Sequence, residues 1–384
     1  MAGRNVYFCV SLIVCGLVAA NQTTPALAGE NPPEAWNRAK AAQFLDARGE
    51  QWFNFGSSHR GKEPNKSSCV SCHSLLSYAL ARPVLRQISN EKRATKWETR
   101  VLEQTRSRIA NWDKLDTETF QLMYDFDDAK KKQSHGTEAI LSALLLARDD
   151  RFAGREKPSD ETKKAFTIMW ATQVSEGKEK GSWDWINFGM DPWEGESSRY
   201  MGACLAAIAV GSAPGYDLAA ANGDLKERLV LLRDYLKKQF AAENLHNRVW
   251  MLWASASIDG LLKQEQKNQL IAQILAKQQA GGGWSLGSLG SYAKKDVKDH
   301  SSTPDGYATG LILHVLQLAG LPKENPQVRK GLTWLRSNQD PTGAWRAWSV
   351  NKNRAPESKD AAKAHIGKFM WDAATAYSVL ALSH

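Results

Sequence analysis

The residues best suited to chemistry are two thiols and an imidazole within five positions, Cys69-Val70-Ser71-Cys72-His73. Two thiols at this spacing, followed at once by His, are the attachment signature of a c-type haem. Each thiol would form a thioether bond with a haem vinyl group, and His73 would be the proximal iron ligand. The same residue types also serve in redox disulfides and in zinc sites that take a fourth ligand from elsewhere. The adjacent His and the export signal described next favour haem.

The N-terminus predicts export. Arg4 precedes an apolar run over residues 6–20, and Ala26-Leu27-Ala28 supplies small residues in an A-x-A arrangement. This is the pattern of a secretory signal peptide over residues 1–28, and its apolar run is too short to cross a bilayer. We therefore expect a soluble periplasmic or otherwise exported protein, with a single domain over residues 29–384.

Cysteine usage is consistent with haem attachment. Cys9 and Cys15 fall within the signal, so only Cys69, Cys72 and Cys204 remain after its removal. Cys204 lies in an apolar run, where we expect a buried and inert thiol. Nothing indicates a disulfide framework, although an oxidising compartment would permit one. A lipoprotein acylated at Cys15 is the alternative, but Val14 is a poor residue before such a cleavage site.

The charge pattern predicts an ordinary solvated surface. The formal net charge is +9, from 50 Lys and Arg against 41 Asp and Glu, and the basic residues are spread among the acids. A spread of this kind does not indicate a nucleic-acid groove. Weak attraction to an anionic lipid surface stays open.

A two-helix unit recurs six times. In its clearest copy an outer helix shows one apolar stripe among charged residues, formed by Leu225, Leu229, Leu232, Leu236 and Phe240. That is the pattern of a helix with one face in solvent, whereas its inner partner, 245–262, is apolar on most sides and must be covered on most sides. The other outer helices are expected at 35–53, 96–112, 159–174, 263–277 and 325–338. Their inner partners are expected at 73–82 (ended by Pro83), 136–147, 198–210, 306–318 and 371–382.

Stacking of these units positions the thiols. Single helix pairs cannot bury their apolar faces, so six consecutive pairs should close into an all-α double ring, an (α/α)6 toroid. Most connections from outer to inner helix are long, at 55–72, 113–135, 175–197, 278–305 and 339–370, whereas the return connections are short. Elaborated loops on one face of a repeat protein usually mark its working face. The thiol motif ends the first of these loops.

A Gln, a Gly and a Trp recur at related spacings, as Gln339, Gly343 and Trp345, as Gln278, Gly282 and Trp284, and, with an insertion, as Gln173, Gly181 and Trp183. The pattern resembles the Gln-Trp repeat of squalene-hopene cyclases and of the wider prenyltransferase and squalene oxidase repeat superfamily. The resemblance rests on motifs in the C-terminal half and on helix periodicity in the N-terminal half. It implies an (α/α)6 toroid whose central cavity holds an apolar, isoprenoid-like small molecule.

The repeat also has a physical interpretation. We expect the Gln amide to satisfy free carbonyls at the end of its outer helix, and the Trp to stack on the neighbouring repeat while its indole N–H finds an acceptor. These residues would join successive repeats and would not take part in catalysis.

The resemblance suggests two further chemistries. Class II cyclases of this superfamily protonate an alkene with an Asp-x-Asp-Asp motif, which Asp125-Phe126-Asp127-Asp128 matches, and clustered carboxylates can keep one member protonated. The match precedes the inner helix expected at 136 and runs into three lysines, so a solvated loop is the competing interpretation. The superfamily's zinc prenyltransferases place Asp, Cys and His at inner-helix starts, where this chain has Asp305, Asp372, His135 and Cys72-His73. Their Asp-x-Cys grouping is missing, and the two aspartates are expected to cap helices.

If His73 begins the first inner helix, a haem would lie at the mouth of the ring. The candidate sixth ligands are then His135 and His246 at comparable helix starts, followed by His59 and Met123. Aromatic residues near inner-helix starts would wall an apolar cavity: Trp185, Phe188, Trp193, Tyr200, Trp250, Trp253, Tyr307 and Trp371.

The favoured interpretation is an exported c-type haem protein that either transfers electrons with a redox partner protein or oxidises an apolar ligand. The alternatives are a haem-free cyclase using Asp125, Asp127 and Asp128, or a zinc prenyltransferase-like or scaffold protein.

Overall fold

The computed structural model describes residues 35–121, 124, 127–216, 223–292, 294 and 296–384. Within it, Ala35–His384 form one compact unit. The signal peptide expected at 1–28 lies outside the described residues, as do Met123 and Asp125. Export therefore stays a prediction from the sequence.

Helices alternate between an outer and an inner layer. The outer helices are α1 (Arg38–Asn54), α3 (Lys96–Ala110), α5 (Asp160–Ala171), α7 (Gly223–Gln239), α9 (Gln264–Leu275) and α11 (Pro326–Ser337). The inner helices are α2 (Leu75–Ile88), α4 (Asp128–Phe152), α6 (Ser198–Ser212), α8 (Leu245–Ser257), α10 (Gly306–Leu318) and α13 (Phe369–Leu382). The short elements between them are η1 (Gly56–Ser58), the antiparallel strands β1 (His59–Arg60) and β2 (Ser67–Ser68), η2 (Trp112–Lys114), η3 (Leu286–Ser288) and α12 (Ala361–Gly367).

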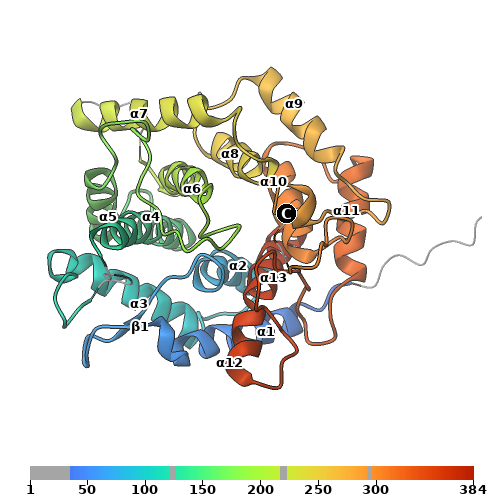
Figure 1. The fold of residues 1–384 in the computed structure, drawn as a ribbon, viewed down its shortest axis with the longest axis horizontal. Coiled ribbons are helices and arrows are strands. Elements are labelled where there is room, and N and C mark those ends of the chain that lie inside the picture. The colour runs from blue at the N-terminus through green and yellow to red at the C-terminus, as the bar shows by residue number, and fades with distance from the viewer. Residues whose placement is uncertain (1–34, 122–123, 125–126, 217–222, 293, 295) are drawn as a thin grey trace, which may run out of the picture. The chain divides into compact units, whose positions relative to one another are not determined.

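The inner helices form a closed ring. Each contacts the next in the order α2, α4, α6, α8, α10 and α13, and α13 contacts α2 (Figure 1). The outer helices surround this ring. The described unit is therefore an all-α (α/α)6 toroid, as the sequence predicts.

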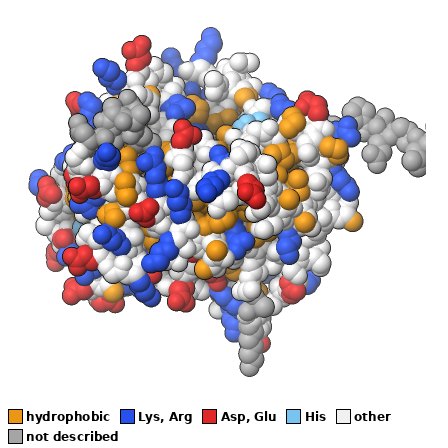
Figure 2. All heavy atoms as spheres, turned by 90° about the horizontal axis from the view of Figure 1, so that it is seen from above, with side chains coloured by type: hydrophobic (Ala, Val, Ile, Leu, Met, Phe, Trp, Pro, Cys, Tyr) orange, Lys and Arg blue, Asp and Glu red, His pale blue; other side chains and the backbone are white. Residues whose placement is uncertain are grey.

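Burial follows the predicted division of layers. In α10 the first eleven residues are all buried, whereas outer α7 buries only Leu229, Leu232, Tyr235 and Leu236. On the face of the unit shown in Figure 2, basic and acidic side chains are both spread over the surface. No helix within the described residues has the length and apolar character needed to cross a membrane.

The Gln-Trp repeats join neighbouring outer helices, and the Gln bonds differ from those expected. The Trp indole N–H donates to a carbonyl near the end of its own outer helix, in the pairs Trp345–Leu335 (2.8 Å), Trp284–Ile274 (2.8 Å) and Trp183–Met169 (2.6 Å). The Gln amide instead donates to a carbonyl in the next outer helix or at its N-cap, in the pairs Gln339–Asn37 (3.1 Å), Gln278–Gln327 (2.8 Å) and Gln173–Arg228 (3.1 Å). The pair from Gln339 to Asn37 joins the last repeat to the first and so closes the ring.

The largest differences from the predicted helix boundaries are in α2 and α4. Helix α2 continues through Pro83 to Ile88, although proline in a helix interior removes a hydrogen bond and crowds the preceding turn. Tertiary contacts offset that cost, because Leu85 is buried and Arg82 forms ion pairs with Asp46 (3.1 Å) and Glu91 (2.6 Å). Helix α4 begins at Asp128 and not at 136.

Candidate functional site at the ring mouth

The long loops gather on the face where the inner helices begin. They join α1 to α2, α3 to α4, α5 to α6, α9 to α10 and α11 to α13, whereas α7 and α8 are joined by a tight connection. The thiol motif lies at the end of the first loop, directly before α2. This arrangement confirms the expectation of one elaborated face that carries the motif.

The motif is a tightly bonded turn. The backbone N–H of Cys69 donates to Ser58 (3.0 Å), and its carbonyl accepts from the Trp52 indole (2.9 Å). The Ser71 hydroxyl accepts from the backbone N–H groups of Ser74 and Leu75, both at 3.1 Å, and so caps the start of α2. The backbone on both sides of the two cysteines is therefore held in place.

Both motif thiols are unpaired and only 2% exposed. Burial raises the pKa of Cys69 to about 12 and raises the pKa of Cys72 well above its ordinary value. Thiols in this state are neutral and weakly nucleophilic. Their environment does not resemble that of a redox disulfide, whose attacking thiol needs a low pKa.

His73 is held by a buried chain of polar groups. Its Nδ1 lies 2.9 Å from the Ser74 hydroxyl, which donates to Oδ2 of Asp372 at 2.6 Å. Arg48 donates to both oxygens of Asp372, at 2.5 and 2.9 Å. Because the serine proton is directed at Asp372, the hydroxyl must accept a hydrogen bond from an Nδ1–H group, which assigns the tautomer.

That tautomer leaves a lone pair on Nε2 of His73, which makes no hydrogen bond within the described part of the chain. Burial also lowers the pKa of His73 well below its ordinary value, so the imidazole is neutral. A neutral imidazole whose other nitrogen is fixed by a polar partner is the form in which histidine binds metal.

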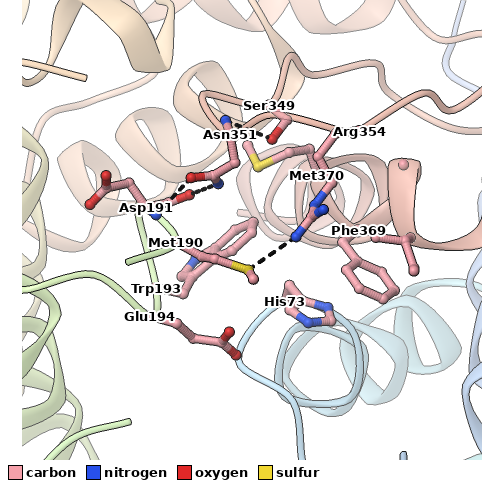
Figure 3. A pocket seen from close by; sticks show the side chains of 12 residues that line it. His73, Met190, Asp191, Trp193, Glu194, Ser349, Asn351, Arg354, Phe369 and Met370 are labelled. Atoms are coloured by element: carbon pink, nitrogen blue, oxygen red, sulfur yellow. Dashed lines mark hydrogen bonds between the residues drawn. The ribbon is translucent and has the colours of Figure 1, made fainter. Parts of the chain in front are cut away.

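A pocket with about 440 Å³ of atom-free space, partly open to solvent, lies beside His73 (Figure 3). The Phe369 ring stacks on the imidazole, with centroids 3.9 Å apart and planes at 17°. The rings of Trp52 and Trp193 lie 5.2 and 5.9 Å away. The remaining lining comes from two loops, the end of α12 and the start of α13: Met190, Asp191, Glu194, Ser349, Asn351, Arg354, Ile366, Gly367 and Met370.

A short hairpin carries Met190 into this pocket. Met190 and Glu194 exchange two backbone hydrogen bonds, at 3.0 and 2.8 Å. Asp191 between them is held by Lys294 (2.8 Å) and by Asn351. Arg354 donates to the Met190 sulfur at 3.0 Å (Figure 3). The thioether of Met190 therefore occupies a fixed position in the pocket that His73 lines.

The three histidines considered as sixth ligands lie elsewhere. His135 contacts Asp116 (3.2 Å) and the Trp112 ring, beyond the end of outer helix α3. His246 is fully buried, and its Nε2 lies 2.8 Å from the Tyr307 hydroxyl. His59 contacts the carbonyl of Phe53 at 2.8 Å. None of the three lines the pocket with His73.

Asp127 and Asp128 lie at the start of inner helix α4, and not in a loop before an inner helix that begins at 136 as the sequence predicts. The Asp127 carboxylate accepts the backbone N–H of Lys130 at 2.7 Å and caps α4. That cap explains why α4 begins at Asp128. Both carboxylates are exposed, which fits a solvated helix cap.

The two aspartates considered for zinc have other partners. Asp305 caps α10 through Ala308 (2.8 Å) and also accepts from the backbone of Leu286 (2.7 Å). Asp372 pairs with Arg48 and sits inside the first turn of α13, not at its cap. Among the described residues, no three His, Cys, Asp or Glu side chains converge as a metal site requires.

Aromatic side chains connect the pocket with the centre of the ring. The indole of Trp193 donates to the Tyr307 hydroxyl at 3.1 Å, and the Tyr307 and Tyr377 rings lie 5.7 Å apart. Trp250 contacts Tyr377 with centroids 5.9 Å apart. Of the predicted wall residues, Trp193, Trp250 and Tyr307 thus contact this centre, whereas Tyr200 bonds to the Leu236 carbonyl of outer α7.

Sequence reasoning missed Met190, Glu194, Arg354 and Phe369. The first three lie in long loops without periodicity, so no local pattern connects them with His73. The only signal was the length of the loops 175–197 and 339–370, which indicated a working face without indicating residues.

No protein-family model matches the chain, and no curated protein matches it. Among solved structures, it is similar to a UGL variant with dGlcA-Glc-Rha-Glc (TM-score 0.48, 12% identity, 89% of this chain and 95% of the other). It is also similar to an unsaturated glucuronyl hydrolase from Bacillus sp. GL1 (0.43, 13%, 79% and 85%). A third similar structure is the type II terpene cyclase MstE from Scytonema (0.44, 14%, 90% and 98%). With TM-scores below 0.5, no activity is inferred from these likenesses.

Proposed function

We propose that this protein is an exported c-type haem protein whose toroid holds the haem at the mouth of its ring. Cys69 and Cys72 would attach it through thioether bonds, and Nε2 of His73 would bind the iron. The observation that carries the proposal is the fixed tautomer of His73 beside a pocket, next to two unpaired thiols. The donor set and its polar support fit a haem iron ligand.

Other residues of this chain would orient His73 and exclude water around it. Asp372, through Ser74, keeps the Nδ1 proton of His73 in place and raises the basicity of the ligand nitrogen. Phe369, Trp52 and Trp193 exclude water around the imidazole. When bound, the haem would supply one-electron iron redox chemistry.

Met190 is the residue we favour for the second iron position, in place of His135 or His246. Its thioether lines the pocket that His73 lines, and a backbone-bonded hairpin holds it. His and Met together are an established axial pair for iron in proteins that carry electrons.

Electron transfer with a partner protein is favoured over oxidation of an apolar ligand inside the ring. Met190 is 38% exposed, so the pocket reaches the protein surface. The centre of the ring near this face is occupied by Trp250, Tyr307 and Tyr377, and Tyr377 contacts the other two.

The test is expression with a cytochrome c maturation system, an absorbance spectrum before and after dithionite, and peroxidase staining of a denaturing gel. We expect a coloured protein that stays stained after denaturation, and loss of that stain when Cys69 and Cys72 are both changed to Ala. Cys204→Ala is the matched control, because this thiol is also buried and unpaired but lies in α6. Colourless wild-type protein from a competent host would rule the proposal out.

A further inference from the structure

A second pocket lies at the opposite end of the ring, where the inner helices end. It holds about 450 Å³ of atom-free space between α2, α3 and α4, partly open to solvent. Six of its ten lining residues are apolar: Ala79, Pro83, Ala94, Leu102, Leu145 and Phe152. The other four are Arg86, Glu98, Arg148 and Asp149.

The two carboxylates of this pocket are already paired. Glu98 accepts from Arg86 at 3.0 Å and from the backbone N–H of Thr95 at 2.8 Å. Asp149 accepts from Arg106 at 2.5 Å. Neither carboxylate therefore neutralises Arg148, the second arginine of this pocket.

Arg148 is the second arginine that lines this pocket. Within the described residues its guanidinium forms no ion pair and no hydrogen bond, and its Nε is buried without an acceptor. The group lies over the Phe152 ring, 5.3 Å from the centroid. Burial and the nearby Arg151 lower the pKa of Arg148 to about 10, which fits a site without a counter-charge.

We propose that this pocket binds a medium-chain carboxylate, with the carboxylate on Arg148 and the alkyl chain along Ala79, Pro83, Leu102 and Leu145. A planar guanidinium with free donors pairs with a carboxylate through two parallel hydrogen bonds. Such a ligand would satisfy the buried Nε and cover the apolar wall at the same time.

Charge and polarity exclude the simpler occupants. A neutral alkane would leave the Nε of Arg148 without an acceptor, and an organic cation would be repelled by the positive charge of Arg148. A small inorganic anion would gain nothing from six apolar residues. An amphipathic anion matches both halves of the site, and this inference does not depend on haem binding.

The experiment is calorimetric titration of the purified full chain with octanoate, compared with octanol. We expect octanoate to bind, and Arg148→Met to weaken it by at least about tenfold, the factor for losing one charge-assisted pair. Octanol, which carries no negative charge, should bind wild type more weakly than octanoate does and should bind wild type and Arg148→Met alike. Leu102→Trp should fill the pocket and prevent binding of both.

Arg100→Met is the matched control. Its guanidinium also lies over a phenylalanine ring, 4.5 Å from the Phe53 centroid, and does not line the pocket. This variant should bind octanoate like wild type. Absence of octanoate binding to wild type, or equal weakening by Arg148→Met and Arg100→Met, would overturn the inference. Far-ultraviolet circular dichroism of each variant checks that it is folded.

Discussion

The Ser74 hydroxyl donates to the Asp372 carboxylate at 2.6 Å across the seam where the last inner helix meets the first. These residues are 298 positions apart in the sequence. The contact that fixes the candidate iron ligand is therefore also one that closes the ring. Formation of the site depends on complete assembly of the toroid.

Ser74→Ala removes the link between His73 and Asp372. We expect a loss of about 2 kcal/mol in unfolding free energy, because the Asp372 carboxylate loses one of its donors inside the core. In haem-loaded protein the reduction potential should rise, since His73 becomes a less basic ligand. Urea unfolding and redox titration measure the two effects.

Ser77→Ala is the control for this change. The Ser77 hydroxyl also bonds to His73, but through the backbone carbonyl at 2.6 Å. We expect a smaller loss of about 1 kcal/mol and an unchanged potential. Equal potentials for the two variants would contradict the proposed role of Ser74.

Met190→Leu tests the second iron position. Covalent haem should remain, because both thiols and His73 are untouched, while carbon monoxide binding to the reduced protein should increase strongly and the sulfur-to-iron charge-transfer band should disappear. Met370→Leu is the matched control, because Met370 lines the same pocket from α13 and is only 3% exposed. If Met370→Leu changes the spectrum and Met190→Leu does not, the assignment is wrong.

The helices could be predicted because their periodicity is local. The range 306–318 expected from the sequence is the observed α10, and 198–210 ends two residues before α6 does. The start of α4 is not predicted, because Asp127 and the charged residues after it have the composition of a solvated loop, although Asp127 caps the helix. The end of α2 is not predicted, because the Arg82 ion pairs that support the helix beyond Pro83 form with Asp46 and Glu91, which lie outside this helix.

The candidate site was only partly predictable. Cys69, Cys72 and His73 form a local motif, so their chemistry can be recognised from five consecutive residues. Loop packing places Met190 in the pocket that His73 lines, and ring closure connects Asp372 to His73 through Ser74. No spacing in the sequence encodes those contacts. The sequence therefore predicts histidines at helix starts as sixth ligands and does not indicate Met190.

Glu194 should make stability depend on pH. Burial raises the pKa of this carboxyl to about 7, against the opposing charges of Arg354 and Lys130. The folded state then binds more protons than the unfolded state between about pH 4.5 and 7. The resulting contribution to the free energy of unfolding is at most about 3 kcal/mol. It is fully present below this pH range and is lost as pH rises through 7.

Urea unfolding between pH 5 and 8 measures this contribution. Glu194→Gln should flatten the slope over this range, because the amide cannot ionise. Glu196→Gln, which changes an exposed neighbour, should keep the wild-type slope. A wild-type slope retained in Glu194→Gln would show that another group is responsible.

Gly343 should tolerate no side chain at the point where the ring closes. Its φ is +95°, and an added Cβ would lie 2.3 Å from the backbone of Lys40 in α1. Gly320 has a similar φ of +92° with nothing within 4 Å of the added atom, so Gly320→Ala measures backbone strain alone, about 1 kcal/mol. Gly343→Ala should cost at least about 2 kcal/mol more, because α1 must also move away from the last repeat. Equal unfolding free energies for the two variants would show that this contact does not hold the ring closed.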